Sequence, residues 1–255
     1  GARETIADLM LAGVRFARDG AGNLLYTREG GHSANRILYH ADTTGKEIAS
    51  RLFSRVRKLK NVHIRPYTSL VDILTDGKEC AGGVLRDERT GEIACVYADY
   101  VILATGGVGG LYASSTNFPQ LTGDGVAICL KHGIAVRDLD YVQIHPTTLY
   151  TKRRGRRFLI SESVRGEGGV LLDGAGRRFT DELKPRDVVP AAIRGQMQKE
   201  GSECVWLDMR TIPPEELRVH FPAIVKRCLE EGYDPFSRPV PVVPAQHYFM
   251  GGIGS

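Results

Sequence analysis

The stretch Tyr100-Val101-Ile102-Leu103-Ala104-Thr105-Gly106-Gly107 decides the fold that this sequence predicts. Its first four residues are typical of a buried β-strand, which would end in small residues and glycines. A backbone without bulky side chains lets a large planar cofactor approach closely. An ordinary tight turn after a strand gives the same pattern, so the stretch alone leaves both interpretations open.

Upstream of this stretch the sequence predicts two helices and then a run of strands. Apolar residues recur at helical spacing over residues 4–11 and again over residues 44–59, which predicts a helix in each place. Strands are predicted at residues 62–66, 69–74, 81–86 and 93–97, with a hairpin turn at Arg89-Thr90-Gly91 before the last of them.

Downstream, Thr122-Gly123-Asp124-Gly125 opens a predicted helix that stops at Gly133. Such a loop-to-helix start presents backbone N–H groups to an anion. Asp124 is either the N-cap of this helix, which its position favours, or a ligand for cofactor hydroxyls. From about residue 141 the sequence changes to mixed short elements rich in proline and arginine, so we place a domain boundary near Asp140.

Composition is that of an ordinary globular protein, with 42% apolar and 25% charged residues among 255. The net charge is only +4, and the one dense basic run, residues 152–157, holds no aromatic residue. Nucleic acid is therefore not an expected partner, and the run is expected to be a solvated loop rather than one that steers an anion. The five cysteines form no C-x-x-C pair, so neither a metal site nor a disulfide framework is predicted. With no apolar run of about 18 residues, we expect a cytoplasmic protein that does not enter a membrane.

Polar residues that suit a small dianion follow along the second half of the chain. A lone histidine is usually structural, but His145 precedes Pro146, which fixes the backbone, and further hydrogen-bonding groups follow it. These groups lie in loops fixed by glycine and proline, and the sequence places them at Ser161, Arg165, Arg186 and His247. Because guanidinium groups match carboxylates bidentately, the set predicts a dicarboxylate site.

The sequence resembles the flavoprotein family of succinate dehydrogenases, fumarate reductases and L-aspartate oxidases, and among these the oxidases most closely. The motifs that carry the resemblance run in the family's order along nearly the whole chain: 27–33 (TREGGHS), 104–107 (ATGG), 123–125 (GDG), 145–147 (HPT), 161–168 (SESVRGEG), 185–187 (PRD) and 247–252 (HYFMGG).

For the substrate, the resemblance implies that Arg186 is the active-site acid/base, although free arginine has a very high pKa. It implies that Glu162 orients the cluster, and that Arg165 and Glu29 orient L-aspartate. The substrate carboxylates would be held by His145, Ser161 and His247. An acidic Glu29 would favour L-aspartate over succinate, because succinate has no amine for it to contact.

For the cofactor, the resemblance implies FAD, contacted by Asp124 and approached by Thr105, Gly106 and Gly107. The implied reaction removes a hydride from the α-carbon of L-aspartate and gives iminoaspartate for the de novo synthesis of NAD, with oxygen or fumarate as electron acceptor. L-Aspartate, fumarate or other small dicarboxylates are the implied ligands, and quinolinate synthase is the implied functional partner. Within the family, a succinate dehydrogenase or fumarate reductase is the alternative.

The implied fold class is α+β, with part of a Rossmann-like FAD-binding domain followed by an α+β substrate-capping domain. We expect residues 1–140 in the first and 141–248 in the second, with 249–255 returning toward the first and ending in a cloning scar. The sequence contains no G-x-G-x-x-G turn of the kind that binds the ADP half of FAD. These residues are therefore also consistent with a non-catalytic fragment that binds FAD weakly, or with an unrelated dicarboxylate-binding module.

Overall fold

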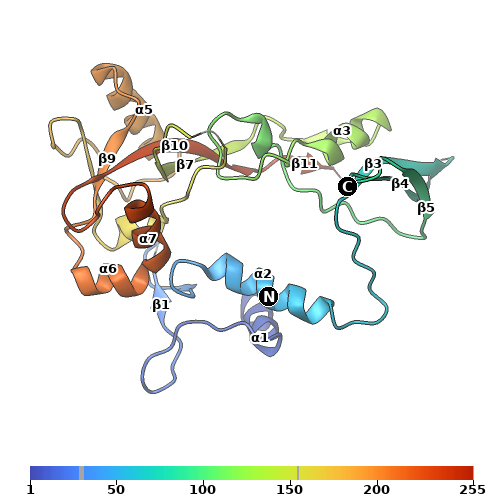
Figure 1. The fold of residues 1–255 in the computed structure, drawn as a ribbon, viewed down its shortest axis with the longest axis horizontal. Helices are drawn as coiled ribbons and strands as arrows, with labels where there is room; N and C mark the ends of the chain where they lie inside the picture. Colours follow the sequence, from blue (N-terminus) through green and yellow to red (C-terminus); the bar gives the residue numbers. More distant parts are fainter. Residues whose placement is uncertain (29–31, 78, 154, 255) are drawn as a thin grey trace. The chain divides into compact units, whose positions relative to one another are not determined.

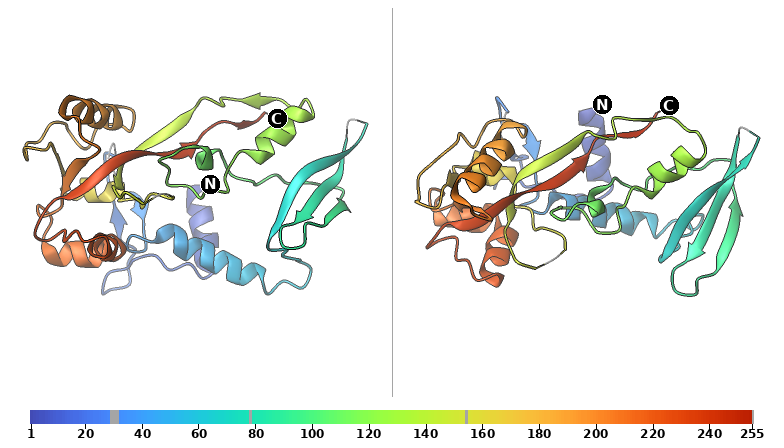
Figure 2. Two further views of the ribbon diagram at one scale, coloured as in Figure 1. Left: turned by 45° about the horizontal axis from the view of Figure 1, so that its top comes forward. Right: turned by 90° about the horizontal axis from the view of Figure 1, so that it is seen from above.

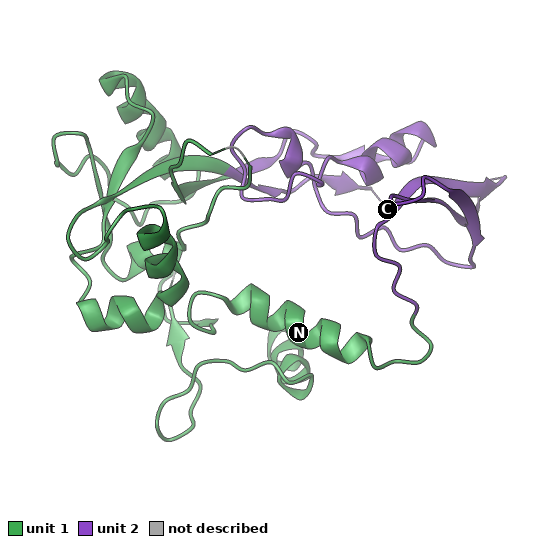
Figure 3. Cartoon of the chain, in the orientation of Figure 1, with its two compact units in different colours: residues 1–62, 144–245 green, residues 63–143, 246–255 purple. Residues whose placement is uncertain are grey.

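The computed structural model describes residues 1–28, 32–77, 79–153 and 155–254. They form two compact units, and each is described by itself (Figure 3). Unit 1 comprises residues 1–62 and 144–245, and unit 2 comprises residues 63–143 and 246–255. The sequence predicts a cofactor domain and a substrate domain. That division follows the expected roles of the residues and not the contacts between them, so it stays a prediction.

Unit 1 is built around a four-stranded sheet in the order β7-β10-β9-β8 (Figure 1). Its strands are β7 (Val142–Leu149), β8 (Val170–Leu172), β9 (Val205–Asp208) and β10 (Val240–Phe249). Helix α5 (Val188–Glu200) lies on one side of the sheet, and α6 (Pro214–His220) and α7 (Pro222–Glu230) lie on the other (Figures 1 and 2). The hydrophobic core fills the space between these layers, and its fully buried side chains include Leu149, Ile160, Leu171, Ile193, Leu207 and Cys228.

The N-terminal part of unit 1 contains α1 (Ala2–Leu11), the short strands β1 (Tyr26–Thr27) and β2 (Ile37–Leu38), and α2 (Thr44–Val56). It is tied to α7 by Asp42, whose Oδ2 accepts a hydrogen bond from the Ile224 N–H at 2.8 Å. Helix α7 begins with Pro222 and has no capping side chain of its own, so Asp42 satisfies one of the open N–H groups of its first turn.

Unit 2 contains an antiparallel sheet of β3 (Thr68–Asp76), β4 (Glu79–Asp87) and β5 (Ile93–Tyr97), seen in both views of Figure 2. It also contains a short 3-10 helix (Gly109–Leu111), helix α3 (Asp124–Lys131) and the paired strands β6 (Val136–Arg137) and β11 (Gly252–Ile253). Asp72 of β3 fastens the sheet to the end of α3, because it accepts hydrogen bonds from the Lys131 ammonium and from His132 Nε2 at 2.7 Å.

Several predicted elements are confirmed, among them both N-terminal helices, the hairpin before β5, and the helix that stops before Gly133. Two predicted strands are wrong. Residues 62–66 and 100–103 lie in no strand, and Tyr100 and Ile102 are each 90% exposed. A strand of the buried type needs backbone partners and covered faces. Among the described residues, none pairs with 100–103.

The expectation of mixed short elements after residue 141 is also corrected, because β7 and β10 are long strands. Pro146 lies in β7, an edge strand of the sheet, and edge strands are where proline is usually found within sheets. Pro241 lies in the inner strand β10 opposite Trp206, and its carbonyl accepts a hydrogen bond from the Tyr150 N–H at 2.9 Å. None of the helices in the described part of the chain is long and apolar enough to cross a membrane.

Candidate active site

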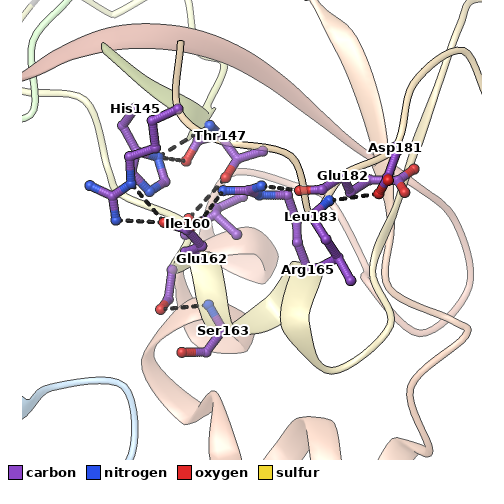
Figure 4. A network of polar contacts seen from close by, with 11 residues as sticks. His145, Thr147, Ile160, Glu162, Ser163, Arg165, Asp181, Glu182 and Leu183 are labelled. Atoms are coloured by element: carbon purple, nitrogen blue, oxygen red, sulfur yellow. Dashed lines mark hydrogen bonds and ion pairs between the residues drawn. The ribbon is translucent and has the colours of Figure 1, made fainter. Parts of the chain in front are cut away.

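Strand β7 holds His145 with its side chain almost wholly buried, at 1% exposed. Its Nδ1 lies 3.2 Å from the Thr147 N–H and 3.1 Å from the Thr147 carbonyl oxygen. Nδ1 cannot accept the Thr147 N–H and donate to the Thr147 carbonyl at once. Either tautomer of the imidazole nevertheless keeps the ring beside Thr147. The Thr147 hydroxyl in turn donates to the Ile160 carbonyl at 3.1 Å, which joins β7 to the segment that leads into the next helix (Figure 4).

That helix is α4 (Glu162–Gly166), and Ser161 directly precedes it. The Ser161 Oγ accepts the Ser163 N–H at 3.2 Å and so acts as the N-cap. The hydroxyl can still donate its own proton, so capping is compatible with its predicted contact to a substrate carboxylate. Directly after the helix, Glu167 Oε2 lies 2.7 Å from His220 Nδ1, which fastens the end of α4 to α6.

Glu162 lies between two arginines and is itself 5% exposed. Its Oε2 accepts from Arg186 Nε at 2.7 Å and Nη2 at 2.6 Å. Its Oε1 lies 3.6 Å from Arg165 Nη2. Two guanidinium groups thus contact one carboxylate, and the buried setting strengthens the interactions between these charges.

The Arg165 side chain is fully buried, and it is also held by a neutral group. Its Nη1 donates to the backbone carbonyl of Glu182 (Figure 4). The Glu182 carboxylate has other partners. It accepts hydrogen bonds from the Leu171 N–H at 2.8 Å and from Arg178 Nη2 at 2.5 Å. Nothing in the sequence motifs pointed to Glu182, since a glutamate in a charged loop is usually solvated.

His247, in the part of β10 that belongs to unit 2, is held by a polar loop that sequence reasoning missed. Its Nδ1 lies 2.7 Å from the Thr116 hydroxyl, and its carbonyl accepts from Asn117 Nδ2 at 2.9 Å. Ser115 of the same loop donates to Gln246 Oε1 at 2.6 Å. The run of hydroxyl and amide residues at 114–117 was the available signal, but such runs are also typical of plain turns.

The residues predicted to approach the flavin lie together in unit 2. Gly123, at φ +83°, stands at the N-cap of α3, so the expectation that Asp124 caps this helix is wrong. Asp124 is instead the exposed first residue of α3, and its Oδ1 accepts from the Thr122 hydroxyl at 2.7 Å. A Cβ on Gly125 would lie 2.2 Å from Thr105 Oγ1, which shows that Thr105 packs against the first turn of α3.

This arrangement fits part of FAD. An exposed carboxylate, a hydroxyl and the open N–H groups of a first helical turn suit the hydroxyl-bearing section of the cofactor. The negative charge of Asp124 would repel a phosphate placed at the same point. Gly107 has a packing reason besides any ligand, because its Cβ would lie 2.7 Å from Phe249 Cβ.

Five of the predicted substrate residues therefore belong to unit 1: His145, Ser161, Glu162, Arg165 and Arg186. His247 and the predicted flavin residues belong to unit 2. Glu29 lies outside the described residues. Among those described, no group of three or more histidine, cysteine or acidic side chains could hold a metal ion.

Comparisons with known proteins agree with the sequence motifs. L-aspartate oxidase of Clostridium perfringens is 46% identical over 251 residues, which cover 98% of this chain and 56% of that protein. L-aspartate oxidase of Clostridium acetobutylicum is 44% identical over 252 residues, or 98% of this chain and 58% of that protein. A solved quinol-fumarate reductase with menaquinol molecules has a TM-score of 0.89 at 31% identity and matches 98% of this chain and 47% of its own.

The chain thus spans about half the length of the curated relatives it matches. The predicted mixture of helices and sheets in a flavoprotein fold is confirmed by these neighbours and by the elements described above. A family model described as an FAD binding domain matches residues 1–254. Because that match takes in nearly every residue of the sequence, the chain belongs to the FAD binding domain family.

Proposed function

We propose that this chain is part of an FAD-dependent oxidoreductase that oxidises L-aspartate to iminoaspartate. The observation that supports the proposal is the buried cluster in which Glu162 contacts both Arg165 and Arg186, because guanidinium groups are the side chains best suited to bind the carboxylates of a dicarboxylate. Identity above 40% to two L-aspartate oxidases supports the choice of substrate. We expect a cytoplasmic enzyme whose product is used by quinolinate synthase.

We assign a separate role in substrate binding or catalysis to each residue of the site. The substrate carboxylates are bound by Arg165, the Ser161 hydroxyl and the two histidines, and bound FAD supplies the two-electron acceptor. Arg186 is the acid/base group. An acid/base group needs a neighbour with which it can exchange the proton. Glu162 makes two contacts to Arg186 and has its other oxygen toward Arg165, so it offers that route.

The second candidate is a succinate dehydrogenase or fumarate reductase, which the TM-score of 0.89 to a quinol-fumarate reductase favours. The two candidates differ in whether an amine is recognised. The full-length protein, purified with FAD, should be mixed anaerobically with L-aspartate or with succinate while the flavin absorbance is followed. We expect bleaching by L-aspartate. Bleaching by succinate alone would assign the second candidate.

Glu29 is proposed as the partner of the substrate amine. Replacing Glu29 with Gln should lower kcat/KM for L-aspartate about tenfold or more, the usual effect of losing a hydrogen bond to a charged group, and should leave any succinate activity unchanged. Glu4→Gln, at an exposed glutamate of α1, is the matched control. An unchanged preference in Glu29→Gln would remove Glu29 from this role.

A further inference from the structure

We infer that Glu167 and His220 are positioning residues for the substrate site. Together they hold the C-terminal end of α4, the helix that carries Glu162 and Arg165, and so set where these two side chains lie. The inference rests on the proposed function, because that function makes α4 part of the substrate site. Neither Glu167 nor His220 is expected to touch substrate or cofactor.

Helix α4 is too short to hold its own position. It has only five residues, and an isolated helix needs about 12–15 residues to be even marginally stable in water. Contacts with other segments must therefore fix both of its ends. At its start, Ser161 caps the helix, and the Ile160 carbonyl accepts a hydrogen bond from the Thr147 hydroxyl of β7.

Contacts to the segment around α6 fix the other end of α4. Glu167 Oε2 lies 2.7 Å from Nδ1 of His220, the last residue of α6, and these side chains are 22% and 34% exposed. The Gly168 carbonyl accepts from the Thr211 hydroxyl at 2.7 Å. The Glu167 N–H donates to the Ser163 carbonyl at 2.8 Å, so a displacement of Glu167 would also displace the helix.

The segment that receives these contacts is itself firmly packed. Ile212, Leu217 and Phe221 are at most 3% exposed and belong to the hydrophobic core of unit 1. Thr211 directly precedes the first of them, and His220 directly precedes the last. Because protein cores are close-packed, this segment gives α4 a fixed support.

The ion pair of Glu47 and Arg51 on α2 offers a matched control. Its two atoms, Oε1 and Nε, lie 2.8 Å apart, and its side chains are 13% and 39% exposed. It therefore resembles the pair of Glu167 and His220 in length and in exposure. Glu47 accepts from the Arg15 N–H and from Arg51, and neither partner belongs to α4.

The test uses the full-length enzyme with FAD and compares His220→Leu with Arg51→Leu. A displaced α4 would misplace groups that bind the substrate, so in His220→Leu kcat/KM for L-aspartate should fall about tenfold to hundredfold and Kd for succinate should rise about tenfold. Loss of a side chain with only a structural role lowers the unfolding temperature and leaves Kd unchanged, which is the result expected for Arg51→Leu.

His220→Asn should rescue binding. Its amide nitrogen takes about the place of Nδ1 and can donate to Glu167, so Kd for succinate should stay within about threefold of wild type. Thr211→Val removes the second contact to α4 and should raise Kd in the same direction, which keeps the test open if His220→Leu folds poorly.

Amide hydrogen exchange over residues 162–167 should accelerate in His220→Leu and not in Arg51→Leu. Unchanged exchange or an unchanged Kd in His220→Leu, an equal rise of Kd in Arg51→Leu, or no rescue by His220→Asn would overturn the positioning role. A wild type that neither binds succinate nor oxidises L-aspartate would instead refute the proposed function on which the inference rests.

Discussion

Two arginines beside Glu162 are held in different ways, and the difference suits different tasks. Arg165 is fully buried and has a neutral carbonyl as one partner, which fits a fixed positive charge for binding an anion. Arg186 is 22% exposed, and two of its nitrogens donate to one oxygen of the Glu162 carboxylate, which fits a group that exchanges a proton. Residue type alone would have made them equivalent.

Gly107 packs closely against Phe249. The sequence predicts that Gly107 makes room for a cofactor. The structure adds a packing reason for glycine there, because a Cβ would lie 2.7 Å from the Cβ of Phe249 and 3.2 Å from the Phe249 ring. Gly107→Ala should therefore destabilise unit 2 by about 1–3 kcal/mol, as overpacking does, and a urea titration would measure the loss.

The control for this change is Gly252→Ala. No atom lies within 4 Å of the position that a Cβ on Gly252 would take, and its φ is not in the left-handed region. We expect a change within about 0.5 kcal/mol. Equal effects of the two substitutions would show that the contact with Phe249 is not what requires glycine at position 107.

Among the secondary-structure elements, the link between β3 and α3 rests on Asp72. Hydrogen bonds from Lys131 and His132 lower the pKa of Asp72 from 3.8 to about 2. Because the folded-state pKa lies below the ordinary value, the ionised form favours folding, and this contribution is complete above about pH 4 and lost as pH falls through 2.

Asp72→Asn should therefore lower the urea midpoint at pH 7, and the difference from wild type should shrink as pH falls below 4. The pH series of urea titrations is the measurement. In a Lys131→Met background the same change should cost less, because one partner is already missing. A difference that stays constant down to pH 3 would contradict the assigned contacts.

Elements whose partners are near in sequence were predictable, and those with distant partners were not. β5 was predicted at its observed bounds because it forms a hairpin with β4. Residues 100–103 have the composition of a buried strand, but a strand forms only where a neighbouring backbone completes its ladder. Strand β10 was not predicted, because prolines such as Pro241 and Pro244 argue against a strand. Both nevertheless lie within β10.

In the whole molecule, the predicted site residues are divided between the two units, with the arginine cluster in unit 1 and His247 in unit 2. The motifs identified most of these residues because their types and order match a known family. They did not identify the supports, Glu182 for Arg165 and Thr116 for His247. These contacts depend on how the chain packs in three dimensions, and the partners are 17 residues apart in the first pair and 131 in the second.

The measurement that tests the account most directly is anaerobic reduction of the flavin by L-aspartate in the full-length enzyme, compared between wild type and Arg186→Leu. Arg194→Leu, at an exposed arginine of α5, is the control. We predict that Arg186→Leu keeps its flavin but is reduced about 100-fold to 10,000-fold more slowly, the range for loss of an acid/base group, while the control matches wild type. Reduction of Arg186→Leu at a rate within tenfold of wild type would contradict the central role given to Arg186.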